Sequence, residues 1–135
     1  MGKLTDNERK DMRELFEKYN LHQDDIFTHN HFVIIKRTGI EKIQAQMNIQ
    51  IDYEEIVASI DEVVLKATAT YLSENGKHRV AREIVTYGEA SPKNCKNAYF
   101  WATAEKRALS RAVLKCVGLY KFGVYGEDEN VQSDE

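Results

Sequence analysis

The sequence has little proline, little cysteine and no long apolar run. Its 135 residues include one proline, Pro92, and two cysteines, Cys95 and Cys116. Two cysteines without a CxxC pair argue against a disulfide scaffold or a metal site, and they are typical of free thiols in a reducing compartment. No apolar stretch approaches the roughly 20 residues that span a bilayer, and the first residues lack the apolar core of a signal peptide. We therefore expect a cytoplasmic protein without a membrane partner.

The sequence also lacks the motifs of the common enzyme classes. It contains no P-loop, no GxGxxG after an expected strand, no GxSxG and no HExxH. Cys95 lies near two lysines, but no histidine is placed to activate it. Four acids, Glu54, Glu55, Asp61 and Glu62, keep a metal-dependent nuclease as an alternative function, although exposed acids are ordinary on half-buried strands. We predict that the protein is not an enzyme and uses no metal or cofactor.

Hydrophobic spacing predicts one α+β domain over residues 1–126, beginning with helices. Thr5 and Glu8 form a capping-box pattern ahead of a helix that reaches about Tyr19. That helix carries one apolar stripe, made by Met12, Leu15, Phe16 and Tyr19. A short apolar run over residues 32–35 favours a strand because it is rich in β-branched residues. Thr38 and Glu41 then predict the cap of a short helix over residues 39–47.

Three alternating segments follow and predict an antiparallel meander. Residues 48–59 and 60–71 alternate between apolar and polar side chains, as half-buried strands do. The Asn75-Gly76 pair is a strong hairpin signal, and the return strand covers residues 79–87. A helix over residues 98–117 ends at Gly118, and Trp101 lies on its apolar side. The expected fold is an antiparallel three-stranded meander packed against a long C-terminal helix, with N-terminal helices.

Positive charge gathers in the hairpin, the following loop and the long helix of a chain whose net charge is -3. Arg107, Arg111 and Lys115 are spaced i, i+4, i+8, which predicts a cationic stripe on the helix, unless they are simply a solvated face. Binding of phosphates requires several cations on one surface, and short connections favour a helix that packs beside the hairpin. We predict a nucleic-acid-binding groove with nine cations: Lys77, Arg79, Arg82, Lys93, Lys96, Lys106, Arg107, Arg111 and Lys115.

Aromatic residues in the same unit could stack on unpaired bases. Tyr87, Tyr99 and Phe100 are the candidates, because base stacking on an aromatic side chain is tolerant of sequence. The alternative for each of them is a place in the core. Trp101 is assigned to the core, because it lies on the apolar side of the expected helix.

The order of strand, loop and helix carries a resemblance to a known family. Residues 85–90, with the pair Tyr87-Gly88, end the expected strand, a loop rich in Lys and Asn follows, and residues 102–118 form a basic helix that ends in glycine. This order resembles the single-strand annealing proteins of the eukaryotic Rad group and their phage relatives, including the Erf type. The resemblance covers roughly residues 32–126. It implies ATP-independent binding of single-stranded DNA, annealing of complementary strands in phage-type DNA recombination, and homo-oligomeric rings or filaments in a bacterial or phage-infected cell.

The last residues, 127–135, form an acidic run without periodicity. Such a composition predicts a disordered acidic tail that follows the domain. Tails of this kind can recruit a protein partner or compete with DNA. The alternative function is therefore a protein-interaction module, such as a phage accessory or inhibitor protein, that acts through this tail and through the N-terminal helix.

Overall fold

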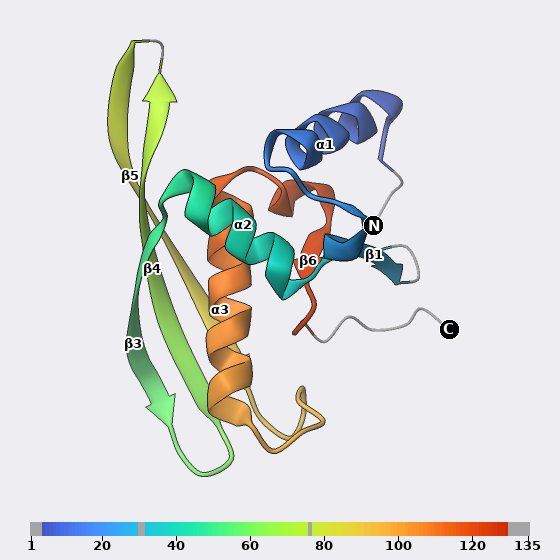
Figure 1. Ribbon diagram of the computed structural model, residues 1–135. Helices are drawn as coiled ribbons and strands as arrows, with labels where there is room; N and C mark the ends of the chain where they lie inside the picture. Colours follow the sequence, from blue (N-terminus) through green and yellow to red (C-terminus); the bar gives the residue numbers. More distant parts are fainter. Residues whose placement is uncertain (1–3, 30–31, 76, 130–135) are drawn as a thin grey trace.

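The computed structural model describes residues 4–29, 32–75 and 77–129 (Figure 1). Its elements are α1 (Asp6–Lys18), η1 (Gln23–Asp25), β1 (Ile26–His29), β2 (Phe32–Ile35), α2 (Arg37–Met47), β3 (Gln50–Ala58), β4 (Val63–Asn75), β5 (His78–Ala90), α3 (Phe100–Cys116), η2 (Tyr120–Phe122) and β6 (Val124–Gly126). The α+β class is confirmed. No helix within these residues is long and apolar enough to cross a membrane.

The predicted meander is the larger of two sheets. β3, β4 and β5 pair in antiparallel order, with Ala67 opposite both Tyr53 and Thr86. β4 and β5 are longer than predicted: they form a hairpin of two 13-residue strands whose last pair is Asn75 and His78. The far end of this hairpin extends beyond the helices (Figure 1). A long arm therefore carries the predicted hairpin cations away from the body of the protein.

A second, mixed sheet was not predicted. It has the order β1-β2-β6, in which β1 and β2 are antiparallel while β2 and β6 are parallel. The predicted strand over residues 32–35 is confirmed as β2. β1 and β6 have four and three residues, too few for alternation to mark them as strands. Because β6 pairs with β2, the chain just before residue 127 is fixed in the core.

The first helix forms as predicted, and the second begins differently. In α1 the Thr5 side chain accepts from the Glu8 amide and Glu8 accepts from the Thr5 amide, as in a capping box. In α2 the N-cap is Lys36, and Thr38 lies inside the helix. The Thr38 hydroxyl donates instead to the Asp25 carboxylate at 2.6 Å. The predicted cap at Thr38 is therefore wrong, because a buried carboxylate takes its hydroxyl.

Asp25 anchors α2 to η1. It is 2% exposed and accepts hydrogen bonds from the Lys42 ammonium at 2.7 Å, the Thr38 hydroxyl and the His22 amide. Burial alone would raise the pKa of Asp25, but these three donors lower it to about 2. This buried carboxylate is therefore ionised at neutral pH and well satisfied by hydrogen bonds.

The long helix α3 lies on the inner face of the meander and contributes residues to both hydrophobic core clusters. Its buried side presents Ala104, Ala108 and Ala112 to the protein interior. Trp101 was assigned to that core, but it is 46% exposed. The assignment fails because α3 packs on β4 and β5, so the side of its first turn that carries Trp101 is only partly covered. Small residues, not the large aromatic, make the contact with the sheet.

Candidate nucleic-acid interface

The close approach of α3 to β5 sets the position of every cation on the helix. Gly88 lies directly under the helix: a Cβ built on it would be 2.0 Å from the Ala104 carbonyl oxygen and 2.6 Å from the Ala108 amide nitrogen. The buried Thr86 hydroxyl donates to the Ala108 carbonyl at 3.0 Å. The glycine of the Tyr87-Gly88 pair is therefore required by packing, since only glycine lets the backbones come so close.

Arg107 is a buried structural residue. Only 4% of it is exposed, and its guanidinium group joins three segments of chain. It donates to the Glu89 carbonyl at 2.8 Å, to the side chain and carbonyl of Asn94 at 2.8 and 2.7 Å, and to the Asp128 carbonyl at 2.6 Å. These four bonds use all three guanidinium nitrogens, which a phosphate would need as donors. Arg107 therefore does not lie on an open groove.

Arg111 lies between two carboxylates. It donates to Glu129 through two nitrogens, both at 2.6 Å, and to the two oxygens of Glu89 at 2.8 and 3.0 Å. Its remaining donor reaches the Tyr87 carbonyl at 2.7 Å. Burial would lower the pKa of Arg111, but the two carboxylates raise it above its ordinary range. All five guanidinium donors are thus satisfied within the chain.

These two arginines tie β5, the loop before α3 and the C-terminal segment together. We call Glu89, Asn94, Arg107, Arg111 and Glu129 the arginine clasp. Burial would raise the pKa of Glu89, but the hydrogen bonds and charge of Arg111 lower it below its ordinary value. Asp128, whose carbonyl binds Arg107, has a raised carboxyl pKa because it is half-buried. The clasp therefore contains two positive and two negative side chains, so it has no net positive charge to offer a ligand.

The predicted stripe of three cations on α3 is not a continuous exposed surface. Arg107 and Arg111 belong to the clasp, whereas Lys115 is exposed, with its ammonium 5.3 Å from the centre of the Tyr120 ring. Helical spacing placed the three on one side of the helix, but residues 127–129 cover two of them. These covering residues are the start of the predicted disordered tail; residues 130–135 lie outside the described part of the chain.

The hairpin and loop cations are exposed, as nucleic-acid contacts must be. Lys77, Arg79 and Arg82 lie at the far end of β5, where Arg82 donates to the Ser73 hydroxyl at 2.9 Å. Lys93 and Lys96 lie in the loop after β5, and Lys106 on α3 is partly exposed. None of these six, nor Lys115, forms an ion pair with another described residue.

The two exposed groups are far apart and do not share one compact groove. Eight residues of β5, 83–90, lie between Arg82 and the loop, a span of about 27 Å in an extended strand. α3 runs along this span, from the loop toward the hairpin arm (Figure 1). Any shared binding surface is therefore a long track beside α3, with Lys106 and Lys115 between its ends.

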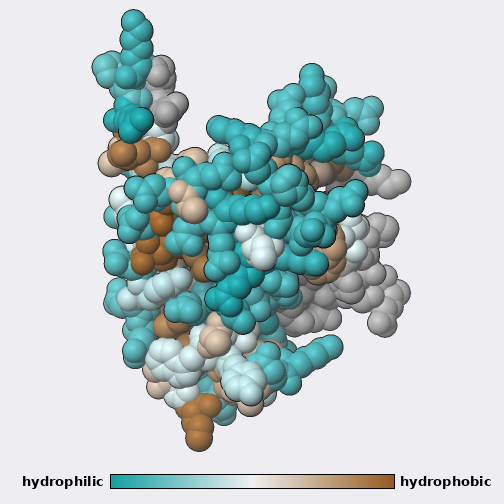
Figure 2. Space-filling view, viewed as in Figure 1, coloured by the Kyte–Doolittle hydropathy of each residue, from teal (hydrophilic) through white to brown (hydrophobic). Residues whose placement is uncertain are grey.

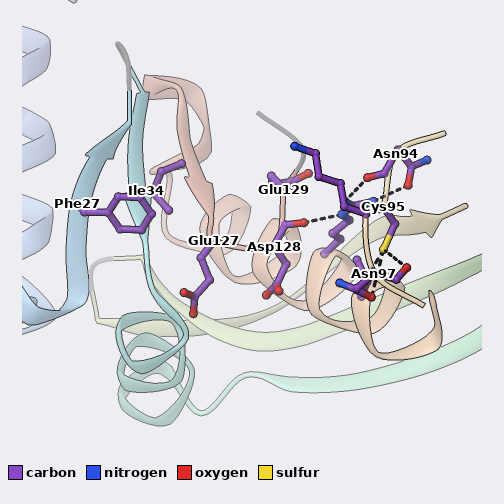
Figure 3. Close-up of a pocket in the computed structure, with 11 residues that line it drawn as sticks. Phe27, Ile34, Asn94, Cys95, Asn97, Glu127, Asp128 and Glu129 are labelled. Carbon is purple, nitrogen blue, oxygen red and sulfur yellow. Dashed lines mark hydrogen bonds between the residues drawn. The ribbon is translucent and has the colours of Figure 1, made fainter. Parts of the chain in front are cut away.

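An open pocket of about 380 Å³ lies next to the clasp (Figure 3). Its wall toward the second sheet contains Phe27 and Ile34. Across the pocket lie the loop before α3, with Asn94, Cys95, Lys96 and Asn97, and residues 127–129 of the C-terminal segment. The lining therefore includes exposed Lys96, the buried guanidinium group of Arg107 and three acidic residues, and sequence reasoning gave no sign of this pocket.

The candidate aromatic residues divide between surface and core. Tyr87 is 50% exposed and Tyr99 is 73% exposed, so both can reach a ligand. Phe100 is partly buried and packs against the smaller core cluster. Figure 2 shows mostly hydrophilic surface, with scattered hydrophobic residues along the sheet and at its lower end. One exposed aromatic residue, Tyr99, and two exposed lysines thus occur together in residues 93–99.

The other candidate chemistry finds less support in the structure. Cys95 is buried, with its sulfur 3.6 Å from the Thr103 hydroxyl, and burial raises the pKa of Cys116 to about 11. Among the described residues, no three His, Cys, Asp or Glu side chains gather closely enough to hold a metal ion, so the acids suggested for a nuclease are not brought together there. In comparisons with known proteins, no family model, curated protein or solved structure matches the chain.

Proposed function

We propose that this protein binds single-stranded DNA without ATP and promotes annealing of complementary strands in phage-type recombination. The observation that carries the proposal is a set of exposed or partly exposed cations that form no ion pair with another described residue and that follow α3 from the loop to the hairpin: Lys93, Lys96, Lys106, Lys115, Arg82, Arg79 and Lys77. Their spread suits an extended, flexible strand better than a compact ligand. Exposed Tyr99, beside the loop lysines, adds a surface on which an unpaired base can stack.

The proposed mechanism needs charge neutralisation and alignment and no covalent step. Lysines and arginines hold the phosphate backbone while the base edges stay open for pairing with a second strand. A single subunit offers few contacts, so we also propose that copies assemble into a ring or filament, which multiplies weak contacts into one long site. The protein-interaction alternative has less support, because the apolar stripe of α1 packs against the protein's own core.

The test compares anisotropy of a labelled single-stranded oligonucleotide with that of its duplex, over a series of salt concentrations. We expect tighter, salt-sensitive binding of the single strand, followed by ATP-independent acceleration of annealing. Lys93→Ala combined with Lys96→Ala should lower the slope of log affinity against log salt by about 1.4, because each phosphate contact contributes about 0.7. Lys10→Ala with Arg13→Ala on the exposed side of α1 is the matched control. Absence of binding at low salt would rule out the proposed function.

Arg107 and Arg111 are unsuitable for this test, although the sequence pointed to them first. Both hold the clasp together, so their removal disturbs the fold and the binding measurement at once. The exposed loop lysines separate the two effects. A double variant with unchanged stability and unchanged salt slope would show that the loop does not contact the strand.

A further inference from the structure

The carboxylate of Glu129 has a feature that sets it apart from the other partner of Arg111. Glu89 belongs to β5, and its place is fixed by the hydrogen bonds of a regular strand. Glu129 follows β6, in a segment that contributes no side chain to either hydrophobic core cluster. Of the two carboxylates, Glu129 is the one that can leave without breaking a sheet.

The segment that carries Glu129 is attached to the protein by polar contacts. Glu127 accepts from the Arg37 backbone amide at 2.7 Å, the Asp128 carbonyl accepts from Arg107, and Glu129 accepts from Arg111. Only the last of these contacts is a close pair of opposite charges between side chains. The Arg111 and Glu129 side chains are 19% and 10% exposed, so this pair is mostly shielded from water, and Arg111 needs a replacement anion when Glu129 leaves.

A phosphodiester has the chemistry to replace this carboxylate. Both groups carry one negative charge and present two oxygens that match the fork of a guanidinium group. If a phosphate took the place of Glu129, Arg111 would keep its bonds to Glu89 and to the Tyr87 carbonyl, and its two other donors would bind the ligand. The exchange preserves the number of hydrogen bonds and the local charge.

We propose that Glu129 occupies at Arg111 the position that a phosphodiester of single-stranded DNA takes when residues 127–129 move aside. The inference rests on the proposed function and adds a phosphate site to it, midway along the track between the loop lysines and Lys115. The acidic segment is then a competitor within the same chain, which lowers affinity for isolated phosphates and yields to a polyanion that also engages the exposed cations.

The test uses Glu129→Gln in the full chain, with Glu127→Gln as the matched control. Both variants remove one negative charge from the same three-residue segment, but only Glu129 touches Arg111. We expect Glu129→Gln to raise the affinity for a single-stranded oligonucleotide about threefold to tenfold, and Glu127→Gln to raise it less than about twofold. Adding Arg111→Lys to Glu129→Gln keeps the charge, removes the fork and should abolish most of the gain.

Thermal unfolding of each variant shows whether the fold is intact. If the wild-type protein binds the oligonucleotide and Glu129→Gln binds no better than Glu127→Gln, the inference is wrong and the proposed function stands. The same holds if the gain survives Arg111→Lys. If neither the wild-type protein nor Glu129→Gln binds at low salt, both proposals fail together.

Discussion

The arginines of α3 and the cations of the hairpin arm show two uses of the same chemistry. Arg107 is 4% exposed and makes bonds to three segments of the chain. Arg79, on the arm, is exposed and forms no ion pair with a described residue. Both were assigned to one groove because both are basic and because short connections favour a helix that packs beside the hairpin. Residue type and spacing therefore predict where positive charge lies, but not whether the fold has already used it.

The difference has a physical cause in the surroundings of each cation. α3 lies in the middle of the protein, where a buried guanidinium group must find acceptors. Glu89, Asn94 and residues 128–129 supply them. The arm extends beyond the helices, so its cations remain hydrated and available to a ligand. We expect substitutions in the clasp to change stability, and substitutions on the arm to change binding.

The largest loss of stability should follow a change at Gly88, whose contact with α3 positions the clasp. Gly88→Ala places a methyl group 2.0 Å from the Ala104 carbonyl oxygen, where no flexible side chain can give way. α3 must move, and the cost should be about 4 kcal/mol or more of unfolding free energy. Chemical denaturation measures this loss, and loss of cooperative unfolding would be the extreme form of the same result.

Gly118→Ala is the matched control for that substitution. Gly118 has a positive φ of 79°, but a Cβ there meets no atom within 4 Å. Gly118→Ala should lower the free energy of unfolding by about 1–2 kcal/mol, from backbone strain alone. If Gly88→Ala were no more damaging than Gly118→Ala, the close approach of α3 to β5 would not hold and the clasp would lose its geometric basis.

The second-largest loss of stability should follow substitution of Arg107 itself. Arg107→Lys keeps the charge but loses the planar fork that binds Asn94 and the two carbonyls, so buried acceptors are left without donors. We expect a loss of about 3 kcal/mol in unfolding free energy. Arg79→Lys on the arm should stay within about 0.5 kcal/mol of wild type. Equal effects of the two substitutions would erase the distinction between clasp and arm.

Much of the fold follows from local signals in the sequence. The capping box of α1, the alternation of β3 and β4, the hairpin signal before β5 and the span of α3 all depend on residues a few positions apart; Gly76, in that hairpin signal, lies outside the described residues. The meander is confirmed for that reason. The second sheet was missed because β6 is three residues long and pairs with β2, some 90 residues earlier. Local patterning does not encode such a long-range parallel pair.

The clasp was missed although the sequence carried one sign of it. Thr103, Arg107, Ser110 and Leu114 recur at spacings of three and four, and all four are buried. An arginine inside a stripe of small and apolar residues indicates a buried guanidinium group. Its acceptors could not be identified, because one of them, the Asp128 carbonyl, lies in a run that composition alone assigned to a disordered tail. The same run supplies Glu129, the partner of Arg111. The exposure of Trp101 was missed because helical periodicity shows which residues share a side of the helix, but not how much of that side the sheet covers.

The smallest and most selective effect should be the pH dependence of the clasp. The pKa of Glu89 is lowered from 4.5 in the folded protein, so its ionised form stabilises the fold above pH 4.5, and this contribution is lost as the pH falls below that value. Glu89→Gln lacks the titrating group, so its deficit in unfolding free energy should be largest near pH 7 and should shrink on acidification. Denaturation at several pH values measures that difference. Glu83→Gln, an exposed position of the same strand, should stay close to wild type throughout; a deficit of Glu89→Gln that does not change with pH would mean that the Glu89–Arg111 pair adds no electrostatic stability.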